Sequence, residues 1–186
     1  MPRAFPHQLA WLLNNPVRGL LLSPRTLLSR LPLRPTDRIV ELGPGSGYFS
    51  LALSAAVPQG HLELVDLQPE MLAKARRRLS ARGRSNVGYT VADAGSPLPL
   101  ASASFDVALL VHVLGEVEDP SQCLRSLAGV LKPGGVLALH EGVPDPDRIP
   151  IANLVSLVGA HGWSLDRIEG PRWNYTALFR RHDILD

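Results

Sequence analysis

Short apolar runs alternate with helical patterns along most of the chain. Continuous or alternating apolar runs indicate strands, whereas apolar residues spaced three and four apart indicate helices. Strands that alternate with helices form parallel sheets, but the last two strands are joined only by the turn at 170–174. The pattern therefore predicts an α/β fold, with a doubly wound, mostly parallel sheet that ends in a C-terminal antiparallel hairpin. The predicted strands are 39–40, 61–66, 86–92, 105–111, 136–141, 163–169 and 175–181, and the predicted helices are 48–53, 69–81, 119–131 and 151–160.

Two N-terminal helices are predicted before the first strand, at 6–14 and 23–31. Ser23-Pro24 begins the second one, with a capping residue followed by a proline in the first turn. Both helices precede the strand and helix repeats. The predicted organisation is therefore an N-terminal helical segment at 1–36 followed by one domain at 37–186.

Charge is distributed unevenly along the chain. Residues 1–36 contain five arginines and no acid, a net charge of +5, whereas the rest of the chain carries −3. A basic segment of this kind favours an anionic substrate or peripheral contact with a membrane surface, or it is a solvated helix face. A transit peptide is also rich in arginine, but prolines such as Pro6, Pro16, Pro24 and Pro32 interrupt any long amphipathic helix in this segment. No broad basic surface with interleaved aromatic residues is evident, so we expect no nucleic-acid partner.

Length and composition exclude several classes of protein. A chain of 186 residues, 45% apolar and 19% charged, suits one folded domain with a sizeable core. No apolar stretch approaches the roughly 20 residues of a membrane span. The single Cys123 excludes an internal disulfide, and the six histidines show no metal-ligand spacing. We therefore expect no metal and a reducing, cytoplasmic setting.

A glycine-rich turn stands between the first predicted strand and the helix that follows it. Its sequence is Glu41-Leu42-Gly43-Pro44-Gly45-Ser46-Gly47. Glycines at alternate positions permit positive φ and let a ligand approach the main chain, and the helix N-terminus attracts a carboxylate or phosphate. A dinucleotide fingerprint would have glycine where this chain has Tyr48, and no lysine of a phosphate-binding P-loop is present.

An acid on the strand followed by G-x-G-x-G resembles the first motif of class I S-adenosylmethionine (SAM)-dependent methyltransferases. Three more features of that family follow in order: Asp66, Asp93 and the turn Pro133-Gly134-Gly135. The overall pattern is most similar to the small-molecule group that includes ubiquinone and menaquinone biosynthesis methyltransferases. The resemblance implies a Rossmann-like fold, SAM as methyl donor, and N-terminal helices that cover the substrate end of the cofactor as a lid. It also implies that the glycine turn binds the cofactor, through Glu41, Gly43, Pro44, Gly45, Ser46 and Gly47.

The resemblance assigns the nucleoside to two strand ends. Asp66, 19 positions past Gly47, stands where a carboxylate accepts hydrogen bonds from both ribose hydroxyls, and Leu67 stands where a side chain covers an adenine face. Asp93 and the backbone of Ala94 would bind the adenine ring. Each acid also has a structural interpretation: Asp66 as the cap of the next helix, and Asp93 as a turn-forming residue.

His112 follows the fourth strand, where the methyl end of the cofactor is expected. It is the first candidate for a general base, with Glu116 and Glu141 next; His112 would otherwise line the cofactor cleft or be structural. In-line displacement from a sulfonium mainly requires alignment of the reactants and exclusion of water, which fits the absence of a Ser-His-Asp or metal constellation.

The expected partner is a small-molecule methyl acceptor; a quinone-like or lipidic one is a hypothesis based on the apolar, basic N-terminus. Trp11, Trp173 and Tyr175 would wall its pocket or pack at the hairpin. The sequence makes no prediction of the oligomeric state. Two rival functions stay open at this point: a noncatalytic SAM-binding partner protein, and a nicotinamide-dependent oxidoreductase.

Overall fold

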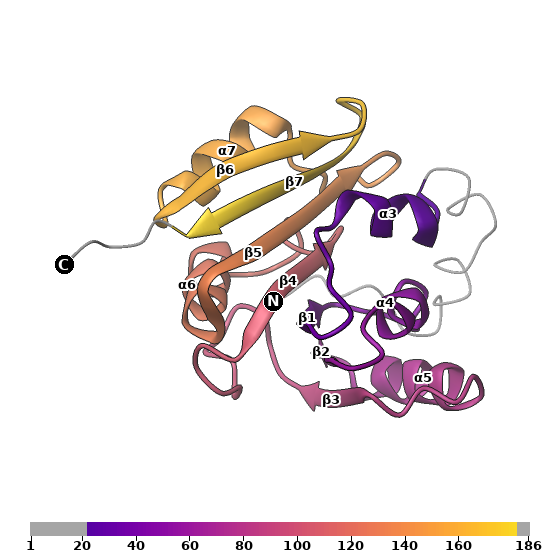
Figure 1. Cartoon of the computed structure of the whole chain (residues 1–186). Coiled ribbons are helices and arrows are strands. Elements are labelled where there is room, and N and C mark those ends of the chain that lie inside the picture. The colour runs from indigo at the N-terminus through magenta and orange to yellow at the C-terminus, as the bar shows by residue number, and fades with distance from the viewer. Residues whose placement is uncertain (1–21, 182–186) are drawn as a thin grey trace.

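The computed structural model describes residues 22–181, which form a seven-stranded sheet with helices on both faces (Figure 1). The strand order is β3-β2-β1-β4-β5-β7-β6. The strands are β1 (Arg38–Leu42), β2 (His61–Asp66), β3 (Val87–Val91), β4 (Phe105–Val111), β5 (Leu131–Gly142), β6 (Trp163–Glu169) and β7 (Asn174–Arg181). The helices are α3 (Pro24–Arg30), α4 (Ser50–Ala56), α5 (Pro69–Ser80), α6 (Pro120–Val130) and α7 (Ile151–Gly159).

The first five strands run parallel, and the last two form the predicted hairpin. β1 pairs in parallel with both β2 and β4, β4 pairs in parallel with β5, and β7 is antiparallel to β5 and β6. The predicted α/β fold with a C-terminal antiparallel hairpin is thus confirmed. The chain leaves β1 toward β2 on one side and reaches β4 on the other, so the carboxyl ends of β1 and β4 flank a topological switch point. Open α/β sheets bind their ligands at such points.

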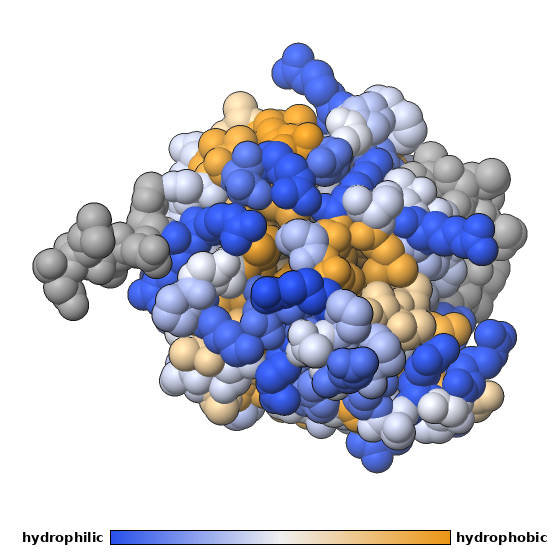
Figure 2. Space-filling view, in the orientation of Figure 1, coloured by the Kyte–Doolittle hydropathy of each residue, from blue (hydrophilic) through white to orange (hydrophobic). Residues whose placement is uncertain are grey.

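Each face of the sheet buries its own apolar layer. In β4, Val107 and Leu109 face the layer that α3, α4 and α5 cover, whereas Ala108 and Leu110 face α6 and α7. Alternate residues of a strand point to opposite faces, so a central strand covered on both sides reads as the continuous apolar run seen at 105–111. Hydrophilic side chains cover most of the outer surface on the side seen in Figure 2, with apolar patches that include one over α7.

Local sequence signals set the ends of most helices. The Ser23 side chain accepts a hydrogen bond from Thr26 N at the start of α3, and Asp119 does the same from Gln122 N at the start of α6. Two predicted boundaries were wrong by two residues or more at the start of an element: α4 begins at Ser50 rather than at Tyr48, and β5 begins at Leu131 rather than at Val136, so Pro133-Gly134-Gly135 lies within β5. Tyr48 still belongs to the turn, because the positive φ of Gly47, 77°, directs the chain away from a helical course.

The N-terminal segment is described only in its second half. The predicted helix at 23–31 is confirmed as α3, whereas the one at 6–14 lies outside the described residues. Leu27 is buried in the apolar layer beside α4, and Arg30 donates hydrogen bonds to Asn174 and Thr176 of β7. The division at residue 36 and the lid role of this segment stay predictions. None of the helices between residues 22 and 181 has the length and apolar content that crossing a bilayer requires.

Candidate active site

The glycine turn takes left-handed backbone conformations at all three of its glycines. Gly43, Gly45 and Gly47 have φ values of 63°, 55° and 77°. A Cβ on Gly43 would lie 2.5 Å from Cγ2 of Val113, so both conformation and space require glycine there. At Gly47 a Cβ would lie 3.0 Å from Ala75 of α5, so that glycine permits close helix packing. The backbone of Gly43 is exposed, which leaves its main chain open to a ligand.

Glu41 lies on the buried side of this turn rather than on its exposed side. Its side chain is 2% exposed, and Ser50 Oγ of α4 donates a 2.6 Å hydrogen bond to Oε2. Burial raises the pKa of Glu41 to about 7; the Ser50 bond opposes this shift, and the negative charge of Asp66 adds to it. Glu41 therefore ties β1 to the start of α4, and its direct contact with a ligand stays a prediction.

Asp66 lies at the carboxyl end of β2 and faces the glycine turn. Oδ1 accepts a 2.9 Å hydrogen bond from Gln68 N, and the backbone of Gly45 also hydrogen-bonds to this carboxylate. Burial raises the pKa of Asp66, and these two bonds partly offset the rise. The next side chain, Leu67, is 41% exposed. Asp66 thus supports the turn before α5 and borders the turn proposed to bind the ligand, but it is not the cap of α5, because the N-cap position is Gln68.

Asp93 and Ala94 follow β3 as predicted. Asp93 Oδ1 accepts a 2.8 Å hydrogen bond from Gly95 N, so the turn-forming interpretation of Asp93 is correct, while its contact with adenine stays a prediction. Ala94 packs against the apolar layer under α6. Cys123 of α6 is fully buried, as expected, and burial raises its thiol pKa to about 12. A thiol in this environment is unreactive.

His112 follows β4 in a conformation that few residues other than glycine adopt. Its φ is 58°, and its amide donates a 3.0 Å hydrogen bond to the carbonyl of His140. The ring meets that of His140 edge to face at 5.1 Å, and its Nδ1 lies 3.0 Å from Oδ2 of Asp145. Backbone strain of this kind concentrates at functional sites.

Glu141 and Asp145 complete a cluster with His112. Glu141, at the end of β5, is 2% exposed, and Ile149 N donates a 3.0 Å hydrogen bond to its Oε2. Burial raises the pKa of Glu141 to about 7. The Ile149 bond opposes the rise, and the negative charges of Asp145 and Glu116 contribute to it. The structure therefore brings His112 and Glu141 together, and Glu116 is close enough to act on Glu141 electrostatically.

Sequence reasoning missed Asp145. It lies in a proline-rich loop, and its contact with His112 spans 33 positions of sequence. In the sequence, the acidic residues of this loop were the only signal that could have indicated Asp145. The expectation of no metal was based on histidine spacing within helices; the present cluster is built instead from two strand ends and a loop.

Of the two roles expected for Tyr175, packing at the hairpin is correct and the pocket wall is wrong. Its side chain is fully buried, and its hydroxyl donates a hydrogen bond to the Ile149 carbonyl. Trp173 is 50% exposed at the hairpin turn, and Trp11 lies outside the described residues. Tyr175 is thus a core residue that holds the loop after β5.

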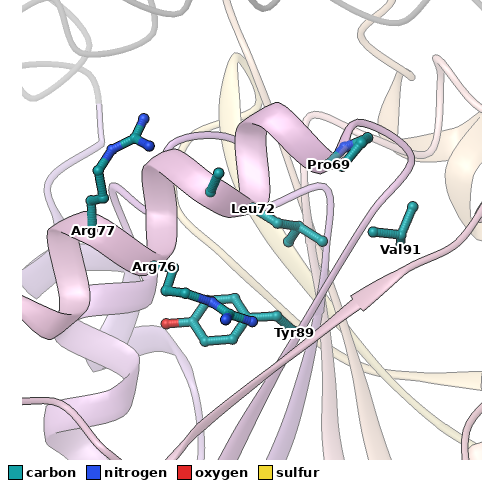
Figure 3. Close-up of a pocket in the computed structure, with 7 residues that line it drawn as sticks. Pro69, Leu72, Arg76, Arg77, Tyr89 and Val91 are labelled. Carbon is teal, nitrogen blue, oxygen red and sulfur yellow. The ribbon is translucent and has the colours of Figure 1, made fainter.

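A shallow groove lies apart from these residues, between α5 and the edge strand β3 (Figure 3). The guanidinium of Arg76 lies 4.5 Å from the ring centre of Tyr89 and thus packs on an aromatic face. None of the residues predicted to bind a ligand lines this groove. Its lining residues are Pro69, Leu72, Ala73, Arg76, Arg77, Tyr89 and Val91.

The residues at the carboxyl ends of β1 and β2 fit a SAM molecule. The open main chain of Gly43 suits its amino-acid tail, the Asp66 carboxylate suits its ribose, and the exposed Leu67 offers an apolar surface to adenine. This arrangement agrees with the implication of the sequence motif.

Known proteins support the same assignment. Residues 40–139 match a family model described as a methyltransferase domain. The chain is 40% identical over 110 residues to the ubiquinone/menaquinone biosynthesis C-methyltransferase UbiE of Vibrio parahaemolyticus, covering 58% of this chain and 42% of that protein. It is 31% identical over 121 residues to an arsenite methyltransferase of Halobacterium salinarum, covering 63% and 31%. The chain thus spans less than half the length of these curated relatives.

Solved structures share the fold. A SAM-dependent methyltransferase from Aquifex aeolicus superposes with a TM-score of 0.85 at 21% identity, covering 95% of this chain and 98% of that one. The [4+2]-cyclase SpnF superposes with a TM-score of 0.68 at 25% identity, covering 78% and 57%. The family match, which covers more than half of the chain, and the motif from Glu41 to Gly47 lead to one conclusion: this chain belongs to the class I SAM-dependent methyltransferase domain family.

Proposed function

We propose that this chain transfers a methyl group from SAM to a small-molecule acceptor by in-line displacement. The observation that carries the proposal is the pairing of an open glycine turn with Asp66 at adjacent strand ends. Gly43 and Gly45 would hold the amino-acid tail, Asp66 the ribose, and Leu67 one face of the adenine. When bound, SAM supplies a methyl group on a sulfonium that is already a good leaving group.

His112 is assigned the role of general base, which removes the proton from the acceptor. An imidazole whose Nδ1 hydrogen-bonds to a carboxylate has a fixed ring orientation, and its Nε2 is then the nitrogen that accepts a proton. Asp145 is thus a positioning residue for His112. Glu141 is the weaker candidate because its carboxyl group is almost completely buried and already accepts a hydrogen bond from Ile149.

The acceptor we favour is a flat, largely apolar molecule of the quinone type. Support comes from the relatives named for ubiquinone and menaquinone biosynthesis, and from an exposed apolar rim near the cluster. Trp173 and Val143 form this rim; they are 50% and 42% exposed and are joined by a 3.0 Å bond from Val143 N to Trp173 O. Arsenite is a poor candidate, because the single Cys123 is buried.

The test is transfer of labelled methyl from SAM to reduced quinone precursors, compared with water-soluble phenols and a membrane extract. We expect label in the quinone-type products, and we expect His112→Asn to lower kcat while SAM binding is kept. Label found only in water-soluble products would contradict the acceptor. Binding of SAM without transfer to any acceptor would instead indicate a noncatalytic binding protein, because a fold does not determine the reaction.

A further inference from the structure

Three side chains with metal-ligating atoms meet where β4 and β5 end. One donor atom each from His112, Glu141 and Asp145 lies within 4.8 Å of the other two, and His112 Nδ1 is 3.0 Å from Asp145 Oδ2. With metal–ligand bonds of about 2.1 Å, neighbouring ligands of an octahedral ion are about 3.0 Å apart and opposite ligands about 4.2 Å. The three donor atoms therefore need side-chain shifts of only about 1 Å or less to share one ion.

The backbone holds these side chains in place before any ligand arrives. The amide of His112 is bonded to the carbonyl of His140, which immediately precedes Glu141 in β5. Asp147 N donates a 3.0 Å hydrogen bond to Oδ1 of Asp145, and the other oxygen, Oδ2, is the one that faces His112. Such support of the ligand side chains is what a metal site requires.

Charge and unused hydrogen-bonding capacity also favour a cation here. Within the described part of the chain, the Ile149 amide is the only hydrogen-bond donor to the Glu141 carboxyl, and this carboxyl is almost completely buried. Asp145 and Glu116 repel its negative charge, and Arg148 is the side chain that attracts it. A buried carboxylate beside two further acids is stabilised by a divalent ion more than by one guanidinium.

We propose that His112, Glu141 and Asp145 bind a divalent transition-metal ion such as Mn²⁺ or Zn²⁺, and that this ion blocks methyl transfer. One imidazole nitrogen with two carboxylate oxygens suits these ions better than Mg²⁺, which prefers oxygen ligands alone. An ion bound to Nδ1 replaces the hydrogen bond between His112 and Asp145. The single proton of the neutral imidazole, which lay on Nδ1, then lies on Nε2, and Nε2 no longer accepts a proton. The inhibition rests on the proposed function; the binding of the ion does not.

The direct test is a titration of the metal-stripped full chain with MnCl₂, in which the electron paramagnetic resonance signal of free Mn²⁺ measures binding. Binding of ZnCl₂ is measured by calorimetry. We expect one saturable site. Asp145→Asn and Glu141→Gln should each weaken binding roughly tenfold or more. Asp147→Asn is the matched control, because it changes an acid in the same loop whose side chain is outside the cluster, and it should bind as the wild type does.

Each outcome bears on the proposal. Thermal melting and SAM binding by each variant show that it is folded, so lost metal binding reports the site itself. Absence of a saturable site, or equal binding by the wild type and both cluster variants, would overturn the metal site. Binding without inhibition of methyl transfer would overturn the blocking role alone. Failure to turn over SAM with any acceptor would contradict the proposed function and leave the binding result standing.

Discussion

Glu41→Gln should change how the stability of this protein depends on pH. The folded state raises the pKa of Glu41 from 4.5 to about 7. The contribution of this group to stability is therefore fully present below pH 4.5 and is lost as pH rises through 7. Between pH 5 and pH 8 the loss amounts to about 2 to 3 kcal/mol, at 1.36 kcal/mol for each pKa unit.

Glutamine removes this loss because it does not ionise. Its carbonyl still accepts the hydrogen bond from Ser50, but its buried NH₂ group costs about 1 kcal/mol or more if it finds no partner. The diagnostic quantity is thus the pH dependence rather than the absolute stability. Relative to the wild type, we expect the variant to gain about 2 to 3 kcal/mol on going from pH 5 to pH 8.

Urea unfolding of both proteins at pH 5 and pH 8 measures this gain directly. Other titrating groups, Glu141 among them, are shared by both proteins and cancel in the difference. Glu70→Gln, at an exposed position in the first turn of α5, is the control and should show a gain near zero over this range. A constant difference between wild type and Glu41→Gln at the two pH values would refute the assignment of a buried, destabilised carboxylate.

Three further changes test other parts of the structure. Gly43→Ala places a Cβ at φ 63° against Val113 and should cost about 1 to 3 kcal/mol in urea unfolding; an unchanged midpoint would contradict the required conformation. Asp145→Asn should lower kcat more than tenfold with unchanged KM for SAM, because it releases His112. A fall in kcat accompanied by an equal rise in KM for SAM would indicate a merely structural role. Trp173→Ala should leave stability within about 0.5 kcal/mol and raise KM for an apolar acceptor, with steady-state kinetics on water-soluble acceptors as the comparison.

The fold was predictable because local patterns and global topology agree. Buried parallel strands such as 105–111 show as continuous apolar runs, and the short link at 170–174 permits only an antiparallel hairpin. The glycine turn and Asp66 were also predictable, since their spacing reflects two adjacent strands whose ends meet at one edge of the sheet.

Contacts that depend on loop conformation were not predictable in the same way. The loop after β5 returns Asp145 to His112, and no periodic pattern encodes that path. The sequence left two roles open for Tyr175 because an aromatic residue beside a turn can face either the core or the solvent, and only packing under the loop decides between them. The later start of α4 follows from the backbone angles of the glycine turn rather than from hydrophobic spacing.

The most direct test of the central claim is calorimetric titration of SAM and S-adenosylhomocysteine into the wild type, Asp66→Ala and Asp37→Ala. Asp37 is a matched control: it is buried and accepts a 2.8 Å hydrogen bond from Arg34 N, but it lies next to the amino end of β1, opposite the ligand site. We expect the wild type and Asp37→Ala to bind both ligands, and Asp66→Ala to bind at least tenfold more weakly, a loss of about 1.4 kcal/mol or more. Equal affinity in all three proteins would contradict the assignment of Asp66 to the ribose, and absence of SAM binding by the wild type would contradict the account as a whole.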